Sequence, residues 1–273
     1  MVRLARIAFA VAFYGATLGP SAADDRFLTL ASTTSTENSG LFEFLLPQFK
    51  SATGIAVRVV AVGTGQALRL GRNGDADALL VHHRPSEEQF VADGFGAERY
   101  DVMYNDFVLI GPAADPAGIS GGAGAGPAFK RIAAAAAVYV SRGDDSGTHK
   151  AEMVIWRHAG VDPVLASGTW YRELGSGMGA TLNAASAMDA YVLTDRATWL
   201  AFANRGRLKV LLEGDPNLFN QYGLVTISSM RYPHVKSEET NRFVAWLLGT
   251  PGQSAIAAFR VRGTQVFFPN AER

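Results

Sequence analysis

The chain has 273 residues, of which 48% are hydrophobic and 18% charged, so it can bury a full core and lacks the composition of a disordered protein. Lys plus Arg and Asp plus Glu both number 25, so the charge gives no sign of a nucleic-acid partner, and any anion binding must come from a local site. The absence of cysteine excludes disulfides, thiolate metal sites, a cysteine nucleophile and a lipid anchor on cysteine.

The N-terminus has the pattern of a secretory signal peptide. Arg3 and Arg6 form a basic start, an apolar run covers residues 7–18, and small residues follow at 21–23. The run is shorter than the ~20 apolar residues that span a membrane. We therefore expect residues 1–23 to be removed, leaving an exported, soluble periplasmic protein without a lipid anchor.

Strands and helices alternate along the rest of the chain. The expected strands cover residues 27–30, 57–62, 77–81, 99–110, 138–140, 191–194, 210–212 and 223–227. The expected helices cover residues 41–49, 87–93, 129–136, 150–158, 180–188, 196–204, 238–248 and 253–259, and one more opens after Gly63. A Gly- and Ala-rich loop is expected over residues 113–127. This alternation predicts an α/β architecture with largely parallel sheets.

Three strand-to-helix junctions are rich in glycine and hydroxyl residues. They are residues 32–36 (Ser-Thr-Thr-Ser-Thr), 63–66 (Gly-Thr-Gly-Gln) and 141–148 (Ser-Arg-Gly-Asp-Asp-Ser-Gly-Thr). Helix N-termini carry unsatisfied N–H donors and a partial positive charge, glycine lets the backbone approach a ligand, and hydroxyls add donors. Together the junctions predict an anion site, although Ser and Thr at a helix start are also simple N-caps.

Arg142 makes the third junction the most informative. An arginine in such a turn offers a fork of donors and a full charge to an oxyanion. Alternatively, it forms an ion pair with Asp144 or Asp145. The sequence does not show where these two carboxylates point, so both interpretations stay open.

The same junction has a weak similarity to a hydrolase. Asp145-Ser146-Gly147, with His149 nearby, is similar to the surroundings of a serine-protease nucleophile. However, Thr148 stands where that pattern has a second glycine, and closeness in sequence does not make a catalytic triad. We therefore expect no enzyme and no catalytic residue.

Other patterns also give little sign of catalytic or cofactor chemistry. His82 and His83 are adjacent, so on a strand they point to opposite faces and are not expected to bind one metal ion. A solvated pair, or a pair that supports other groups, is expected instead. The glycines at 175, 177 and 179 lack the spacing of a dinucleotide-binding loop. No metal centre and no cofactor are expected.

Long motifs lie at residues 32–36, 62–68, 74–77, 100–107, 141–149, 177–182, 193–196 and 219–223, over nearly the whole mature chain. In this order they resemble the periplasmic tungstate-binding proteins of ABC importers, the tungstate-uptake substrate-binding family. The most specific is 141–149. The family often has three successive Thr before Ser in the first motif, whereas this chain has Ser32 in the first position, which keeps a hydroxyl.

The resemblance implies an α/β, two-lobed periplasmic binding protein (type II) fold with the ligand in the cleft between the lobes. Residues 24–103 with 223–273 would form lobe 1, and residues 104–222 lobe 2. Hinges are expected near 104–107 and 220–222. The residues implied to approach the oxyanion are Thr33, Thr34, Ser35 and Thr64 of lobe 1, and Arg142, Ser146, Gly147 and Thr148 of lobe 2.

The implied function is a high-affinity extracytoplasmic receptor, monomeric, that delivers tungstate to an ABC permease and its ATPase. Tungstate is expected through the resemblance alone. Molybdate has nearly the same size and charge, sulfate is smaller, and phosphate needs an acceptor for its proton, which Asp144 or Asp145 could provide. Receptors for molybdate, sulfate or phosphate therefore stay open as alternatives, as does a secreted phosphoester hydrolase.

Overall fold

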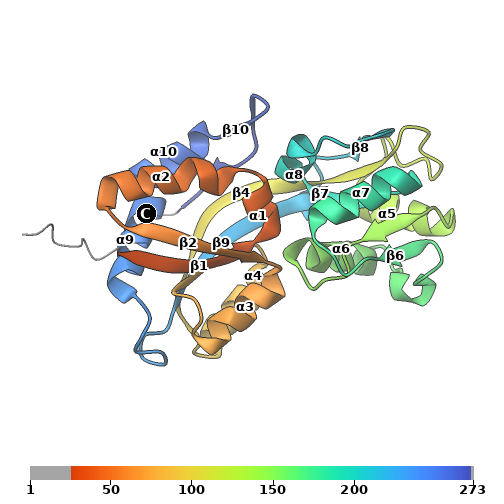
Figure 1. Ribbon diagram of the computed structural model, residues 1–273. Coiled ribbons are helices and arrows are strands. Elements are labelled where there is room, and N and C mark those ends of the chain that lie inside the picture. The colour runs from red at the N-terminus through yellow and green to blue at the C-terminus, as the bar shows by residue number, and fades with distance from the viewer. Residues whose placement is uncertain (1–25, 272–273) are drawn as a thin grey trace, which may run out of the picture.

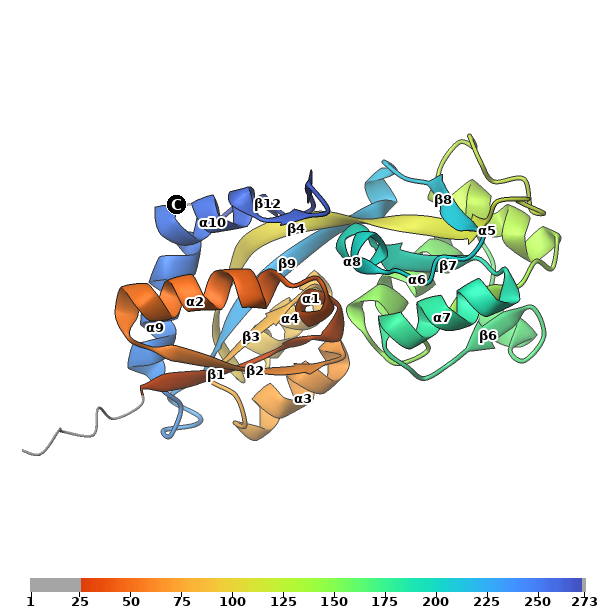
Figure 2. The same ribbon diagram turned by 45° about the horizontal axis from the view of Figure 1, so that its top comes forward.

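The computed structural model describes residues 26–271, so the expected signal peptide lies outside the described residues. Figures 1 and 2 show two halves side by side, joined by two long strands that run from one half into the other. These strands are β4 (Gly96–Pro112) and β9 (Phe219–Ile227). None of the described helices combines the length and hydropathy needed to cross a membrane.

The first half, on the left in Figure 1, is a sheet covered by helices on both faces. Its main elements are β1 (Phe27–Thr33), α1 (Thr34–Asn38), α2 (Leu41–Thr53), β2 (Ala56–Val62), α3 (Thr64–Asn73), β3 (Ala78–Val81), α4 (Arg84–Ala92), α9 (Ser237–Leu248) and α10 (Thr250–Ala258). Short strands β10 (Arg260–Val261), β11 (Thr264–Gln265) and β12 (Phe268–Pro269) follow. Leu28 and Leu30 of β1 pack in the cluster with α2, α9 and α10, whereas Ala31 packs with α3 and α4. Burial on both faces explains why the central strand β3 is a continuous apolar run, Ala-Leu-Leu-Val.

The second half, on the right in Figure 1, is built the same way around the far end of β4. Its elements are α5 (Ala125–Ala134), β5 (Tyr139–Ser141), α6 (Gly147–His158), η1 (Pro163–Ala166), β6 (Tyr171–Glu173), α7 (Met178–Met188), β7 (Val192–Asp195), α8 (Arg196–Ala201), β8 (Leu208–Leu212) and η2 (Pro216–Leu218). Phe107 and Leu109 of β4 pack with α5 and α6, whereas Val108 and Ile110 pack with α7. One strand therefore contributes to the cores of both halves.

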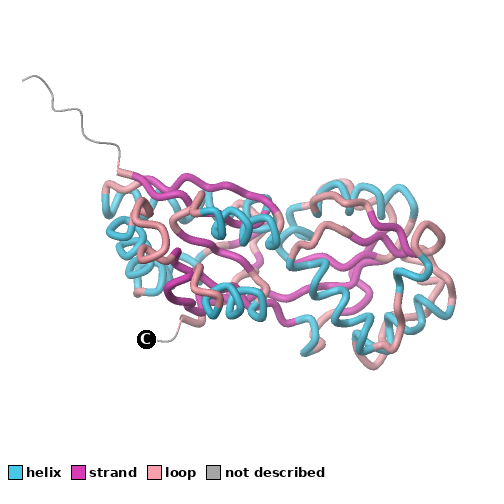
Figure 3. The backbone as a smooth tube through the Cα atoms, turned by 90° about the horizontal axis from the view of Figure 1, so that it is seen from below, coloured by secondary structure: helices cyan, strands magenta, loops and turns pink. Residues whose placement is uncertain are grey.

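The expectation of largely parallel sheets is wrong. β1 pairs in parallel with β2 and β3, and β5 with β6. However, β9 is antiparallel to β3 and β4, and β4 is antiparallel to β7, β8 and β12. The chain enters the second half along β4 and returns along β9, so these two strands run in opposite directions. Figure 3 shows strand segments, in magenta, that run from one half into the other.

The helix and strand boundaries differ from the expected ones where caps and tertiary contacts decide them. α6 begins at Gly147, before the expected Lys150, because Ser146 caps it with its side chain. α5 begins at Ala125, so the Gly- and Ala-rich loop is shorter than expected. Strand β6 was not expected from the sequence. The early start of α6 places Gly147 and Thr148 in its first turn.

Candidate functional site

Helix N-termini from both halves meet at the interface between the halves. α3 begins at Thr64 in the first half, and α6 begins at Gly147 in the second. The Gly147 N–H donates to Thr64 Oγ1 at 3.1 Å, and the Gly65 N–H donates to the carbonyl of Asp145 at 3.3 Å. The second and third junctions predicted from the sequence are therefore in direct contact.

The first junction lies on the same interface, together with the start of α7, a helix that the sequence predicted without assigning it to the site. Thr34 Oγ1 would lie 3.7 Å from a Cβ built on Gly177, the N-cap of α7. The N–H of Ser176 donates to the Arg142 carbonyl at 3.2 Å. The start of α7 thus lies between the first and third junctions. In the sequence, this helix start is marked by Gly177 and Gly179, which belong to the family motif at 177–182. The spacing of these glycines alone did not indicate a binding site.

The hydroxyl groups at these junctions are buried and keep capacity for hydrogen bonding. Thr64 Oγ1 accepts the Gly147 N–H, and Ser146 Oγ accepts the His149 N–H at 3.2 Å, so each hydroxyl can still donate its own proton. Thr34 Oγ1 and Thr148 Oγ1 are buried without a hydrogen-bond partner among the described residues. Because an unpaired buried hydroxyl costs about 1–3 kcal/mol, these atoms indicate a ligand that accepts hydrogen bonds.

Thr33 and Ser35 are buried as well, but the structure pairs them within their own junction. Thr33 Oγ1 accepts the Thr36 N–H at 3.3 Å and lies 2.7 Å from Thr36 Oγ1. It also lies 3.1 Å from Ser35 Oγ. Thr33 is therefore an N-cap, and the contact of Thr33 and Ser35 with an oxyanion stays a prediction.

Arg142 is buried, with 2% of its side chain exposed, and it bonds to Asp144. Its Nε and Nη2 donate to Asp144 Oδ2 at 3.2 and 2.6 Å, while Asp144 Oδ1 accepts the Ser146 N–H at 3.2 Å. The ion pair considered as the alternative interpretation is thus confirmed. The ion pair uses only two N–H donors of the guanidinium and fixes the plane of this group at the start of α6. Arg142 can therefore still donate hydrogen bonds to a ligand.

Asp145 points away from Arg142. Its exposed side chain forms an ion pair with Lys150, and its backbone has a φ of 57°, in the left-handed region. This conformation turns the Asp145 carbonyl toward the Gly65 N–H. A Cβ at position 65 would overlap the exposed Asp145 carboxylate, which would have to move, and would lie 3.2 Å from the Asp145 carbonyl oxygen, so glycine favours this close approach of the two halves.

The histidine pair was expected to be solvated or to support other groups, and the solvated alternative is wrong for His82, whose side chain is buried. Its Nδ1 lies 3.1 Å from Asn220 Oδ1, and its ring stacks on Tyr222 with the centroids 4.9 Å apart. Burial, together with the positive charge of Arg142, lowers the pKa of His82 to about 4. The sequence could not reveal this burial, because the residues around the ring are distant along the chain.

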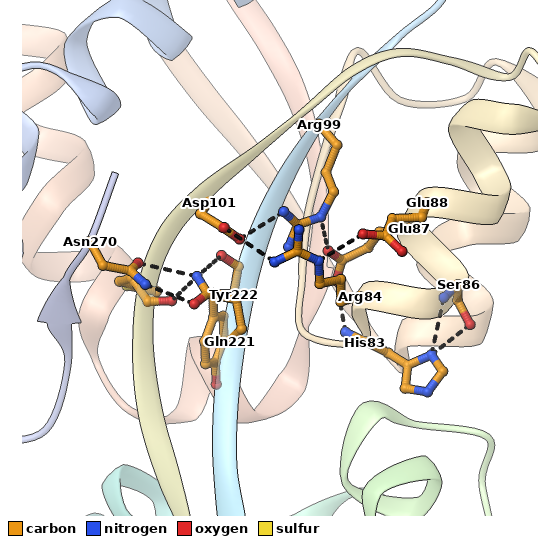
Figure 4. A network of polar contacts seen from close by, with 11 residues as sticks. His83, Arg84, Ser86, Glu87, Glu88, Arg99, Asp101, Gln221, Tyr222 and Asn270 are labelled. Carbon is orange, nitrogen blue, oxygen red and sulfur yellow. Dashed lines mark hydrogen bonds and ion pairs between the residues drawn. The ribbon is translucent and has the colours of Figure 1, made fainter. Parts of the chain in front are cut away.

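His83 and the following helix are tied to β4 by a buried ion pair, drawn in Figure 4. The His83 N–H donates to Glu87 Oε1 at 2.7 Å, and Arg99 Nε donates to Glu87 Oε2 at 2.9 Å. Arg99 Nη1 also donates to Asp101 Oδ1 at 2.7 Å. These bonds hold the turn that carries His82 against the crossing strand β4.

Glu152 is a second buried carboxylate, besides Glu87, and it supports the third junction. Glu152 Oε2 accepts a hydrogen bond from Ser141 Oγ at 2.9 Å. Its Oε1 accepts from Tyr171 Oη at 2.8 Å and from Trp156 Nε1 at 3.2 Å. Ser141 Oγ in turn accepts the Gly143 N–H at 3.2 Å. Glu152 therefore positions the turn that contains Arg142.

Glu152 should make stability depend on pH. Burial raises its pKa to about 7 from an ordinary 4.5, although its hydrogen bonds oppose that shift. A raised pKa means that the folded state keeps a proton that the unfolded chain releases, so this stabilisation is complete below about pH 4.5 and is lost as the pH rises through about 7. The thermal midpoint of the wild type should therefore fall more steeply between pH 4.5 and 8 than that of Glu152→Gln. Glu43→Gln, at an exposed position on α2, should keep the wild-type slope, and parallel curves for wild type and Glu152→Gln would contradict the account.

The hydrolase-like pattern has the bonds of a capped helix start. Ser146 Oγ accepts the backbone N–H of His149, and His149 Nδ1 accepts the backbone N–H of Asp145 at 3.2 Å. Each side chain is thus engaged with the backbone. The imidazole of a nucleophile–base pair would instead accept the proton of the serine hydroxyl.

Comparison with known proteins shows to which family this chain belongs. The family model described as "PBP superfamily domain" matches residues 18–250. A putative ABC transporter anion-binding protein of Haloferax volcanii is 47% identical over 249 residues, covering 89% of this chain and 72% of that protein. The tungstate-binding protein TupA of Peptoclostridium acidaminophilum is 44% identical over 256 residues, covering 90% of this chain and 86% of that protein.

Solved structures give the same result. The tungstate-binding protein TupA from Desulfovibrio alaskensis G20 is 45% identical, with a TM-score of 0.78, and the match covers 90% of this chain and 100% of that one. The tungstate ABC transporter structure from Geobacter sulfurreducens is 46% identical, with a TM-score of 0.78, and the match covers 85% of this chain and 98% of that one. These matches confirm the α/β periplasmic-binding-protein fold, and the chain therefore belongs to the PBP superfamily, in the family of the ABC-transporter tungstate-binding proteins.

Proposed function

We propose that this chain is a high-affinity extracytoplasmic receptor that binds tungstate and delivers it to the permease and ATPase of an ABC importer. The observation that carries the proposal is the meeting of the α3, α6 and α7 N-termini around buried hydroxyl groups and Arg142. A tetrahedral oxyanion accepts hydrogen bonds at every corner, which suits a site built from donors. The names of the similar proteins support tungstate as the ligand.

The contacts proposed for the oxyanion come from both halves. They are Thr33, Thr34, Ser35 and Thr64 from one side, and Arg142, Ser146, Gly147 and Thr148 from the other. The buried hydroxyls of Thr34 and Thr148 give the strongest support, because neither has a partner among the described residues. Thr33 and Ser35 have the weaker support, since their hydroxyls bond to each other.

The proposed lobes are residues 24–103 with 223–273, and residues 104–222, with the hinge on β4 and β9. The hydrogen bonds from Gly147 to Thr64 and from Gly65 to Asp145 would then join the lobes, as in a closed receptor. An anion held by both lobes stabilises closure, because only the closed state makes all the contacts. The closed state is the signal that we expect the permease to recognise.

The affinity of such a receptor cannot come from contact number alone. A nanomolar dissociation constant corresponds to about −12 kcal/mol. A five-atom ligand at the upper limit of about −1.5 kcal/mol per atom would reach only about −7.5 kcal/mol. Preorganised N–H donors, the Arg142 charge and the exclusion of water must supply the difference.

The site geometry also favours a fully deprotonated anion. Phosphate near neutral pH needs an acceptor for its proton. Asp144 already accepts from Arg142 and Ser146 with its two oxygens, and Asp145 faces Lys150 at the surface. Both carboxylates thus already have partners, and a phosphate proton would have to compete with them or use the remaining lone pair of Asp144 Oδ1, which makes the site less suited to phosphate than to tungstate or molybdate.

Competition between anions tests the proposed function. Native mass spectrometry after mixing the purified protein with tungstate, molybdate, sulfate and phosphate together should show one retained tungstate per chain. Preferential retention of sulfate or phosphate would overturn the choice of ligand. Retention of molybdate over tungstate would keep the receptor but change its cargo.

We expect the receptor to be a monomer in the periplasm that binds its ligand without chemical turnover and needs no cofactor. Its relatives are named as binding proteins, which supports a receptor rather than an enzyme. Hydrolysis of a generic phosphoester by the pure protein would contradict this.

A further inference from the structure

We propose that His82 donates a hydrogen bond from Nε2 to the bound oxyanion, and that a relay of Asn220, Asn105 and Tyr222 on the hinge strands reverses its direction to support the tautomer that does so. This role rests on the proposed function and adds a contact outside the strand-to-helix junctions. His82 would be a ligand-binding residue that the site prediction did not include.

The position of the ring supports a ligand contact. His82 follows β3, and its side chain is 5% exposed. A Cβ on Gly147, the first residue of α6, would lie 2.5 Å from His82 Cε1 and 3.0 Å from Nε2, so the ring packs directly on the start of that helix. Nε2 is buried and has no hydrogen-bond partner among residues 26–271. A polar atom in this position, beside donors of the site, needs a partner.

The direction of the relay is coupled to the proton that His82 carries. In the structure, His82 Nδ1 lies 3.1 Å from Asn220 Oδ1, Asn220 Nδ2 donates to Asn105 Oδ1 at 2.6 Å, and Asn105 Nδ2 donates to Tyr222 Oη at 3.5 Å. This direction places the His82 proton on Nδ1, so the proposed contact requires both amides to be turned over. Turning over both amides reverses every bond in this chain of neutral groups. In one direction Nδ1 donates and Nε2 offers a lone pair, which would repel an oxyanion. In the other, Tyr222 donates toward Asn105, Asn220 donates to Nδ1, and Nε2 carries the proton.

The charges around His82 favour a neutral donor. The titratable groups that face the ring are Arg142 with its partner Asp144, the neighbouring His83, and Tyr222 stacked beneath it. Burial and the Arg142 charge keep the His82 pKa near 4, so the ring is neutral at ordinary pH. A neutral ring can donate from Nε2 only in the second arrangement. Anion binding should therefore need no proton uptake by His82.

The first test observes the tautomer directly. Nitrogen-15 NMR of histidine-labelled protein, with and without tungstate, should show a neutral ring with its proton on Nε2 in the complex whose signal changes with tungstate and is removed by His82→Gln. A proton on Nδ1, a doubly protonated ring, or a His82 signal unchanged by tungstate would overturn the inference. If the wild type retains none of the probed anions, the proposed function itself fails. If it retains tungstate but the His82 signal does not behave as expected, only the role of His82 fails.

The second test removes the donor. His82→Phe keeps a flat ring without nitrogen and should weaken tungstate binding about 10- to 100-fold in calorimetry, whereas His82→Gln should recover part of the loss through its amide N–H. His83→Gln is the matched control and should bind like the wild type, because His83 Nδ1 faces Ser86. Thermal unfolding without ligand checks that each variant folds. Equal affinities for wild type and a folded His82→Phe would contradict the role.

Discussion

Replacing Arg142 with glutamate is expected to abolish tungstate binding. The guanidinium is buried at the start of α6, so a glutamate there would set a second carboxylate against Asp144 and against the dianion. Arg142→Lys keeps the charge but loses the planar fork, and should weaken binding about 10- to 100-fold, or about 1.4–2.8 kcal/mol. Isothermal calorimetry measures both changes.

The matched control for Arg142→Glu is Arg157→Glu, which makes the same charge change at an exposed position near the end of the same helix. It should bind tungstate like the wild type. Thermal unfolding without ligand separates lost binding from lost folding. Wild-type affinity in a folded Arg142→Glu would remove Arg142 from the site.

Gly147→Ala is expected to weaken tungstate binding at least about 100-fold while leaving the unliganded protein folded. The added methyl carbon would lie 2.5 Å from His82 Cε1, far inside the ~3.5–4.0 Å of a normal carbon–carbon contact. His82 and Gly147 lie on opposite proposed lobes, so the clash exists only when the lobes close. Gly147 does not have a left-handed backbone, and alanine fits the first turn of a helix, so an open state would tolerate it.

Gly126→Ala is the control for this steric effect. Gly126 also lies in the first turn of a helix of the second half, and a Cβ there would meet nothing within 4 Å. It should leave both affinity and folding unchanged. Undiminished affinity in Gly147→Ala would show that the lobes do not need this close approach to hold the anion.

The sequence predicts the parts of this site that local rules determine. Ser146 and Thr64 stand at helix starts because hydroxyl and glycine residues there satisfy free N–H groups, and such patterns are readable within a few residues. Arg142 could be selected as a site residue because an arginine in such a turn offers a fork of donors and a full charge. The ion pair with Asp144 was one of two open interpretations, since the choice depends on the φ angles of the turn, including the left-handed Gly143 and Asp145.

The sequence does not predict the parts that long-range contacts determine. The strand over 99–110 was expected, but its antiparallel pairing with residues 219–227 depends on how the chain returns from the second half. The burial of His82 depends on Gly147 and Tyr222, which are distant along the chain. For the same reason, the start of α7 could not be assigned to the site before its contact with Thr34 was seen.

If one oxyanion is held between the two halves by helix N-termini and Arg142, the bound tungsten lies at their interface. A crystal structure of the tungstate complex, with anomalous scattering measured at a tungsten absorption edge, locates it. We expect a single tungsten peak at the interface, with oxygens about 2.7–3.1 Å from donors of Arg142, Thr64 and the first turn of α6. A peak that contacts only one half, or that lies away from these junctions, would show that the anion is not held between the halves.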